Sequence, residues 1–268
     1  MRTASAFIKR NFKEMLRDPL VYVFCLGFPL VMIILFQIIN KFTAGNTPMF
    51  DATSLIPGIM MFSFTFVMLT AALLVSKDRT TAFLIRLYTS PMRTADFVLG
   101  YAAPCFLVGI GQEVVCIFAG WIVSLIVGGA YFSFGAAMLL MIEMLPMLLI
   151  CLSFGILFGS LLNDKSAPAI VSVFISMAGI LGGCWMPLDA MGGFETFCRF
   201  LPFYPSVYIG RVITGATHSF PDPVSGGAAV YSFDSVAKLG FIPIALFLLV
   251  GAVFAIVAFR ANMKSDKK

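Results

Sequence analysis

Six long apolar segments alternate with short polar connections along the chain, and each segment is long enough to form a membrane-spanning helix. The segments cover residues 20–40, 55–76, 97–127, 134–162, 167–187 and 238–259. A hydrocarbon core about 30 Å thick takes roughly 20 helical residues, which each of these segments supplies. The pattern therefore predicts an all-α integral membrane protein, with six transmembrane helices in one domain that covers residues 1–268.

The first 19 residues show the periodicity of an amphipathic helix. Its apolar face carries Phe7, Ile8, Phe12, Met15 and Leu16. The opposite face is basic, which is typical of a helix that lies in the membrane interface with its cations toward anionic headgroups. The turn Asp18-Pro19 ends the helix, because proline restricts the residue before it and lacks an amide hydrogen. We expect an amphipathic elbow helix over residues 1–19; the open alternative is a basic tail that only marks topology.

The connection between the second and third spans, residues 77–93, combines positive charge with an apolar ridge. Phe83, Leu84, Leu87 and Tyr88 form the ridge, whereas Arg79, Arg86 and Arg93 fall on another face of the same helical projection. This spacing predicts a short helix from about Asp78 to Tyr88 that stops near Ser90-Pro91. The ridge would pack either against the inner ends of the protein's own spans or against a separate cytoplasmic partner, and the periodicity favours neither.

The charge distribution assigns a side of the membrane to each connection. Charged residues make up 12% of the chain, about half the share typical of soluble domains, and the mean hydropathy is +0.99. Of the 18 Lys and Arg residues, fourteen lie in the N-terminal helix, in residues 77–93, in the connection after the fourth span and at the C-terminus. The positive-inside rule therefore predicts that both termini are cytoplasmic and that residues 188–237 form an external segment.

No pattern in the sequence indicates a catalytic or metal-binding site. The chain has neither the phosphate-binding G-x-x-x-x-G-K-[ST] loop nor a G-x-G-x-x-G turn, and His218 has no second ligand at metal-binding spacing. Cysteines within the spans behave as small apolar residues, whereas Cys184 and Cys198 flank the external segment and could form a disulfide. Any work that the protein performs would then draw its energy from a gradient or from another subunit.

Two glutamates in the third and fourth spans form a candidate polar site inside the membrane. Glu113 lies about 15 residues before the turn at residues 128–129 and Glu143 about 14 residues after it, so antiparallel spans would place both roughly 20 Å below that turn. Gln112 lies next to Glu113 in the sequence. A carboxyl group in the membrane interior is costly, so it is a candidate functional residue. We hypothesise that the two carboxyl groups face each other or a polar pocket, with at least one protonated. The alternative is a structural hydrogen bond to another span.

Small residues in the fifth span are candidates for a helix contact. Ala169, Ser172, Ser176, Gly179 and Gly183 recur at spacings of three and four. Such a stripe allows close approach of another helix, either within one subunit or between two halves of a dimer. The second span is crowded with Met and Phe around Ser63 and Thr65, which on its own is typical of a lipid-facing segment.

Three stretches occur in an order and spacing found in one family of membrane proteins. The stretch "RNFKEMLRDPLVYVFCLGFPLVMIILF" has a basic elbow, a turn at Arg17, Asp18 and Pro19, and Pro29 within the first span. The connection after the second span carries the matching residues Asp78, Arg79, Leu84, Arg86, Leu87, Ser90 and Pro91. The stretch "WMPLDAMGGFETFCRFLPFYPSVYIGRVITG" has a Leu-Pro…Pro…Arg pattern at Leu201, Pro202, Pro205 and Arg211. Together these stretches resemble the permeases of the type-2 ABC exporter family, which includes the daunorubicin-resistance-like membrane subunits.

The resemblance implies the membrane-spanning half of an ATP-driven exporter, with a re-entrant-like external helical hairpin before its last span. In that family the connection after the second span contacts the ATPase subunit, which here would involve Asp78, Arg79, Phe83, Leu84, Arg86, Leu87, Ser90 and Pro91. The partner ATPase would bind ATP and Mg, with no cofactor in this chain. Two permease halves, identical or paralogous, would meet around a path near the first, second and fifth spans, in a bacterial-type cell membrane. The Met-rich second span would then form a soft wall for an amphipathic cargo such as a drug.

Two other functions compete with this one. A gradient-driven carrier or channel could use Glu113 and Glu143 as a proton or cation site, and inverted repeats with broken helices would favour it. The sequence has no clear internal repeat. A membrane scaffold or sensor would need a substantial soluble domain, whereas the longest segment outside the spans is the external one, residues 188–237.

Overall fold

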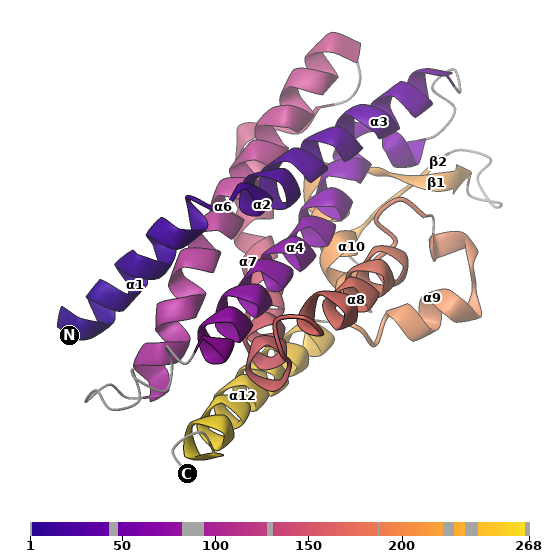
Figure 1. Ribbon diagram of the computed structural model, residues 1–268. Helices are drawn as coiled ribbons and strands as arrows, with labels where there is room; N and C mark the ends of the chain where they lie inside the picture. Colours follow the sequence, from indigo (N-terminus) through magenta and orange to yellow (C-terminus); the bar gives the residue numbers. More distant parts are fainter. Residues whose placement is uncertain are drawn as a thin grey trace.

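Apolar helices make up most of the structure, which is a computed structural model (Figure 1). It describes residues 2–42, 48–81, 94–127, 131–186, 188–221, 228–233 and 241–265. The elements in chain order are α1 (Arg2–Met15), α2 (Pro19–Val21), the π-helix η1 (Tyr22–Gly27), α3 (Phe28–Phe42), the 3₁₀-helix η2 (Pro48–Phe50), α4 (Ala52–Thr80), α6 (Thr94–Val127), α7 (Phe134–Leu161), α8 (Ala167–Leu181), the 3₁₀-helix η3 (Leu188–Ala190), α9 (Gly193–Cys198), α10 (Phe203–Thr214), β1 (Thr217–Pro221), β2 (Ala228–Val230) and α12 (Ile242–Ser265).

Five helical segments in the described part of the chain are long and apolar enough to cross a membrane. They are Pro19–Phe42 (α2, η1 and α3 together), Ala52–Thr80, Ala95–Ile126, Phe134–Leu161 and Ile242–Ala261. The predicted all-α integral membrane fold is confirmed. The fifth predicted span, residues 167–187, falls on α8, which has only 15 residues. At 1.5 Å per residue this helix is about 22 Å long, shorter than a hydrocarbon core.

A glycine pair ends α8 before the predicted end of the fifth span. Gly183 has φ +60°, in the left-handed region that glycine adopts without steric strain. The amide of Cys184 donates to the carbonyl oxygen of Gly179 (3.4 Å), and the amide of Gly183 donates to that of Ile180 (3.1 Å). These two bonds form a Schellman motif, so the chain leaves the helix at this point.

The first membrane-spanning segment contains a π-helical turn. This turn, η1, separates α2 from α3 and ends just before Pro29. Proline has no amide hydrogen, and its ring clashes with the carbonyl group four residues earlier in a regular α-helix. In the wider turn the amide of Phe28 donates to the carbonyl oxygen of Val23, five residues back. The π-helix therefore accommodates the internal proline without breaking the span.

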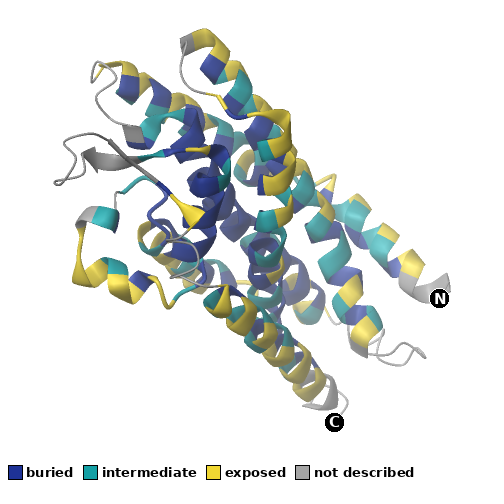
Figure 2. Cartoon of the chain, turned by 180° about the vertical axis from the view of Figure 1, so that it is seen from behind, coloured by how far each residue is buried: buried dark blue, intermediate teal, exposed yellow. Residues whose placement is uncertain are grey.

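Helix α4 lies at the centre of the bundle. Every side chain from Ala52 to Met68 is buried, and Figure 2 shows buried residues in the middle of the bundle and exposed ones on its outer helices. Two glycines let α7 approach α4 closely, because a Cβ at Gly155 would lie 2.6 Å from the Met68 carbonyl oxygen and one at Gly159 would lie 2.6 Å from that of Ala72. Small residues at this spacing are typical of tight packing between membrane helices. The expectation of a lipid-facing second span is therefore wrong.

The segment predicted to be external, residues 188–237, contains the expected helical hairpin and, in its described part, a small sheet that was not predicted. Helices α9 and α10 form the hairpin, and α10 enters the bundle: a Cβ at Gly210 would lie 2.7 Å from the Pro57 Cβ atom. Strands β1 and β2 follow as an antiparallel pair. Cys184 and Cys198, considered above as a disulfide pair, are both free.

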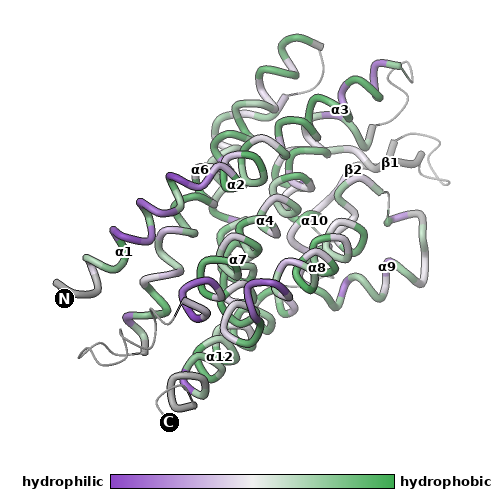
Figure 3. Tube along the Cα trace, in the orientation of Figure 1, coloured by the Kyte–Doolittle hydropathy of each residue, from purple (hydrophilic) through white to green (hydrophobic). Residues whose placement is uncertain are grey.

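Hydrophilic residues gather at one end of the bundle, where α1 and the last turns of α4 and α12 lie (Figures 1 and 3). The rings of Phe97 and Phe259, with centroids 6.0 Å apart, join α6 to α12 there. We call this the basic end; its cations in the described residues include Lys9, Lys13, Arg17, Lys77, Lys165 and Arg260. Helix α1 and the C-terminal end of α12 therefore lie at the same end of the bundle.

Candidate functional site

At the basic end, the apolar face of α1 packs on α6. The Phe7 ring is 4% exposed and stands edge-on to the Tyr101 ring, with 5.0 Å between centroids. Gly100 makes room for it, since a Cβ there would lie 2.2 Å from Cδ1 of Phe7. Asn11 is buried and donates from Nδ2 to the Gly100 carbonyl oxygen (3.0 Å), and Phe12 is half-buried. The elbow helix thus turns Phe7 and Met15 to protein, whereas Leu16 stays exposed; its position in the membrane interface stays a prediction.

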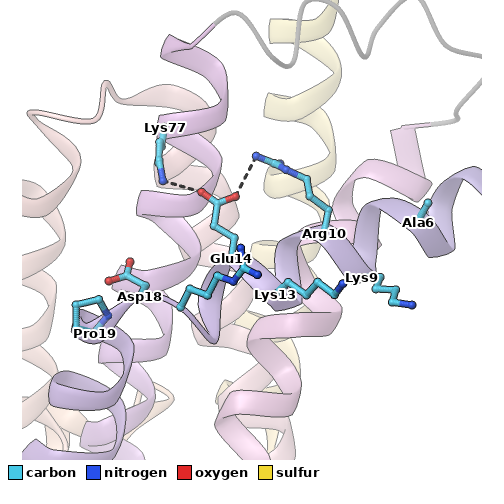
Figure 4. A pocket seen from close by; sticks show the side chains of 9 residues that line it. Ala6, Lys9, Arg10, Lys13, Glu14, Asp18, Pro19 and Lys77 are labelled. Carbon is cyan, nitrogen blue, oxygen red and sulfur yellow. Dashed lines mark hydrogen bonds and ion pairs between the residues drawn. The ribbon is translucent and has the colours of Figure 1, made fainter.

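A buried carboxylate joins α1 to α4 and α6. Asp78 is 2% exposed, and Arg10 binds both of its oxygens, with Nη1–Oδ2 at 2.6 Å and Nη2–Oδ1 at 2.8 Å. The Tyr101 hydroxyl donates to Oδ2 (2.9 Å). Glu14 pairs with Lys77 (2.6 Å) and with Arg10 (3.0 Å), as Figure 4 shows. We call these five residues the elbow junction. The hydrogen bonds to Asp78 raise the pKa of Arg10, so the guanidinium group stays charged.

This burial changes the role expected for Asp78. The side chain lies beneath α1 and binds within the chain, so it is not on the surface where an ATPase would contact it. Arg79 donates from Nη1 to the carbonyl oxygen of Ser160 near the end of α7. The last turn of α4 is therefore joined to α1, α6 and α7 at once. The other predicted contact residues, Phe83, Leu84, Arg86, Leu87, Ser90 and Pro91, lie outside the described residues.

The turn between α1 and α2 is built from Arg17, Asp18 and Pro19. Asp18 is the N-cap of α2, and its Oδ1 accepts from the amide of Leu20 (2.9 Å). Pro19 takes the first helical position, where an amide hydrogen would have no helical partner in any case. Arg17 is exposed. The elbow thus changes direction through a purely local cap.

Polar side chains from several helices gather inside the bundle. Glu113 and Gln112 of α6 are buried, and neither side chain has a hydrogen-bond partner among the described residues. Glu143 of α7 accepts through Oε1 from the hydroxyl of Ser206 in α10 (3.3 Å), whereas its Oε2 has no such partner in the described part of the chain. Both glutamates therefore lie inside the bundle, and Glu143 has a hydrogen bond to another helix, as the structural alternative expected.

Ser63 of α4 is also buried, and its hydroxyl has no hydrogen-bond partner among the described residues. Buried polar groups without partners are costly, and ionisable ones inside a membrane often mark a site for a proton, a cation or water. Sequence reasoning missed Ser206, because residues 188–237 were taken as external. The apolar run of residues 203–214 was the available signal that α10 enters the bundle.

Arg211 is a fully buried cation that connects three segments. Its Nε donates to the Ser54 carbonyl oxygen at the start of α4 (3.1 Å), and Nη2 donates to that of Gly183 after α8 (2.7 Å). The guanidinium carbon lies 5.8 Å from the centre of the Tyr231 ring. Sequence reasoning noted this arginine only as part of a family pattern. The structure shows why an arginine suits the position: one side chain reaches two carbonyl groups on different elements.

The small-residue stripe of the fifth span divides into two parts. Gly179 and Gly183 pack within the subunit; a Cβ at Gly179 would lie 2.8 Å from Cη2 of Trp185. Ser172 and Ser176 are exposed, and their hydroxyls donate to backbone carbonyls of α8 itself, at 2.7 and 3.0 Å. The two glycines therefore serve packing inside one chain, whereas the two serines leave a narrow open strip on α8.

Thr65, predicted near the transport path, lines an enclosed apolar cavity instead of an open surface. The cavity has a volume of about 230 Å³ and lies between α4, α7, α8, α12 and the external hairpin, with Met68, Cys151, Phe174 and Phe247 in its walls. The Thr65 hydroxyl donates to the carbonyl oxygen of Phe62 in its own helix. The Thr65 hydroxyl hydrogen is therefore bonded within the helix and is not available to a ligand in this cavity.

Comparison with known proteins agrees with this architecture. The family model described as ABC-2 type transporter matches residues 3–214, which run from the elbow helix through α10. A comparison with curated proteins gives no match. The match includes the elbow, the central helix α4, the two glutamates and the external hairpin with Arg211. Because it covers well over half of the chain, the protein belongs to the ABC-2 type transporter family and is the membrane component of an ABC transporter.

Proposed function

We propose that the chain is the membrane-spanning half of an ATP-driven exporter, coupled to a separate subunit that binds ATP and Mg and hydrolyses the nucleotide. Membership of the ABC-2 type transporter family supports this, because the membrane component of an ABC transporter works with an ATPase. Two halves, identical or paralogous, would enclose the path in a cell membrane, with both termini cytoplasmic. Catalysis would belong to the partner alone.

The observation that carries this proposal is the attachment of the last turn of α4. Residues 82–93 follow this turn directly and hold most of the predicted ATPase contact. Asp78 is bound by Arg10 of α1 and Tyr101 of α6, and Arg79 reaches the end of α7. A push on the connection would therefore displace four helices together rather than bend α4 alone. The arrangement suits the transfer of mechanical force into the bundle.

The exposed strip of α8 is our candidate for contact with the second half. Ser172 and Ser176 lie there beside Val173, which is 57% exposed, and Ile180, which is 45% exposed. Small residues allow another helix to approach closely. The path would then run between two subunits, where apolar and hydroxyl groups alternate. Such a surface would suit an amphipathic cargo, and efflux of a drug is one example.

Copurification tests the coupling. The chain and its ATPase subunit are expressed together, with Arg86→Glu and Leu87→Asp as variants of the connection and Arg199→Glu on α9 as a matched control. We expect the two connection variants to lose most of the ATPase subunit and the control to retain it. Undiminished binding by both connection variants would remove the assigned role of residues 82–93.

One observation favours a second function, a gradient-driven carrier. Glu113, Gln112 and Glu143 have buried polar atoms without partners among the described residues, as a proton or cation site would. Reconstituted vesicles separate the two functions. For the exporter we expect transport only with ATP and the ATPase, and unchanged transport in Glu113→Gln and Glu143→Gln at normal expression. Cargo movement by the chain alone, lost in these variants, would establish the carrier instead.

A further inference from the structure

Three cations of the elbow helix have no carboxylate partner among the described residues. Lys9, Lys13 and Arg17 are exposed, whereas Arg10 and Lys77 are engaged by the elbow junction. All five line an open pocket of about 860 Å³ between α1 and the end of α4. In Figure 4, Glu14 lies between Arg10 and Lys77, and its negative charge is paired with these two cations. Asp18 is the second carboxylate in the lining, so the pocket has five cations against two carboxylates and is positive overall.

An apolar groove adjoins this pocket. Glu14, Asp18 and Lys77 border both, so the polar pocket and the groove are continuous. The groove has a volume of about 80 Å³, and its apolar walls are Leu20, Val21 and Phe24 on one side and Leu69, Leu73 and Leu74 of α4 on the other. These residues belong to two of the membrane-spanning segments. The groove therefore lies where the acyl chains of a bilayer begin.

We propose that the pocket and groove together bind one anionic phospholipid of the leaflet at the basic end. Its headgroup phosphate contacts Lys9, Lys13 and Arg17, and the upper part of one acyl chain lies between α2–η1 and α4. A cationic pocket that continues into an apolar groove matches a phosphate followed by a hydrocarbon chain, in the same order. A soluble anion would use only the pocket, and a zwitterionic lipid would gain little from the three cations.

The packing of α1 explains why the cations point to a bound lipid. Leu16 is 47% exposed, but Phe7 and Met15 are buried, on α6 and within the bundle, so α1 does not insert these two side chains between lipids. Its basic face is instead directed to the pocket beside Lys77. A lipid in this position would contact α1 and α4 at once and would stabilise the elbow junction, because a ligand that binds only the folded state raises stability.

Lipid binding to the full-length chain in a neutral detergent tests the proposal. Native mass spectrometry compares dioleoylphosphatidylglycerol with dioleoylphosphatidylcholine for the unchanged chain, for Lys13→Gln/Arg17→Gln, and for Lys165→Gln/Arg260→Gln. The control variant removes two exposed cations at the same end of the bundle but outside the pocket. At about fivefold in affinity per cation, we expect phosphatidylglycerol to bind the first variant about 25-fold more weakly and the control with unchanged affinity.

Competition and stability measurements complete the test. We expect inorganic phosphate and sn-glycerol 3-phosphate to compete poorly, and phosphatidylglycerol to raise the Tm of the unchanged chain and the control but not of Lys13→Gln/Arg17→Gln. Equal Tm values of the lipid-free proteins show that the substitutions do not unfold the chain. Equal binding of the two lipids, equal affinity of the pocket variant, or displacement by inorganic phosphate would each overturn the proposal. None of these readouts involves ATP or transport, so they are independent of the proposed function.

Discussion

Two buried charges, Asp78 and Arg211, each connect segments that are distant in the sequence. Asp78 is bound by a guanidinium and a phenol, and Arg211 by carbonyl groups on two other elements. A buried charge is tolerated when such partners surround it, and removal of one partner leaves the other without compensation. Substitutions at these two positions should therefore destabilise the protein more than substitutions of exposed charges.

Asp78→Asn is expected to lower the free energy of unfolding by about 2–3 kcal/mol, because an amide offers only one acceptor oxygen to the bidentate Arg10. The matched control is Glu14→Gln at the exposed side of the elbow junction, where we expect a loss below about 1 kcal/mol. Unfolding of the purified chain in detergent, followed by circular dichroism, measures both. Equal losses in the two variants would mean that the burial of Asp78 contributes nothing.

Arg211→Lys should destabilise the external hairpin even though the charge is kept. A single ammonium nitrogen cannot replace the two guanidinium nitrogens that reach Ser54 and Gly183, so we expect a loss of about 1–3 kcal/mol. Arg199→Lys is the control: Arg199 is exposed and pairs with Glu195 one turn away, and its replacement should cost less than about 0.5 kcal/mol. Limited proteolysis of the external segment gives a local readout. A hairpin equally resistant in both variants would contradict this assignment.

At this scale, local features could be read from the sequence and distant partners could not. The Asp18 cap joins residues two apart, so Asp18-Pro19 indicates it directly. The partner of Asp78 is 68 residues away, and a charged connection gives no sign that its first acid will be covered by α1. The position of Glu113 and Glu143 inside the bundle was predictable, because each lies within a long apolar span.

At the scale of elements, the end of α8 determines the shape of the external segment. The Schellman motif places Gly183 beside Leu188 and directs the chain toward the hairpin, whose α10 then enters between α4 and α7. Apolar length alone predicted a longer fifth span, since the sequence up to residue 187 stays apolar. The glycine pair was the local signal for an earlier end, and hydropathy does not register it.

Gly183→Ala tests this helix end. Alanine at φ +60° is strained, and its Cβ would lie 2.9 Å from Leu188, so we expect a loss of about 1–2 kcal/mol. Gly111→Ala in α6 is the control, because no atom lies within 4 Å of a Cβ there and alanine is the better helix former. Thermal unfolding should show a lower Tm for the first variant and an unchanged or higher Tm for the second. A Gly183→Ala chain as stable as the original would argue against the motif.

At the scale of the whole molecule, the positions of the spans followed from the sequence, but their arrangement did not. Each span is a continuous apolar run, so its existence is a local property. The central place of α4, the entry of α10 and the small β-sheet depend on contacts between distant segments. Gly155 and Gly159 show the difference: their spacing permits a close contact, but only the fold shows that α4 is the partner.

Cysteine labelling tests the sidedness of the bundle. The six native cysteines are buried, so an introduced cysteine can be followed with a membrane-impermeant maleimide. Ser5→Cys and Asp164→Cys should label from one side, and Thr196→Cys on α9 from the other, since the exposed Ser5 and Asp164 lie at the basic end. In right-side-out vesicles we expect only Thr196→Cys to react before permeabilisation. Reaction of Ser5→Cys under the same conditions would invert the assigned topology.

The elbow junction also imposes an order on biogenesis. Arg10 is synthesised before its partners, since Asp78 follows 68 positions later and Tyr101 later still. At roughly 5–20 residues per second, α1 waits about 5–20 s before the helices that cover it have been synthesised. During that interval its apolar face has no protein to pack on. The nascent chain therefore depends on the membrane surface, or on the insertion machinery, to shelter this helix until α4 and α6 are in place.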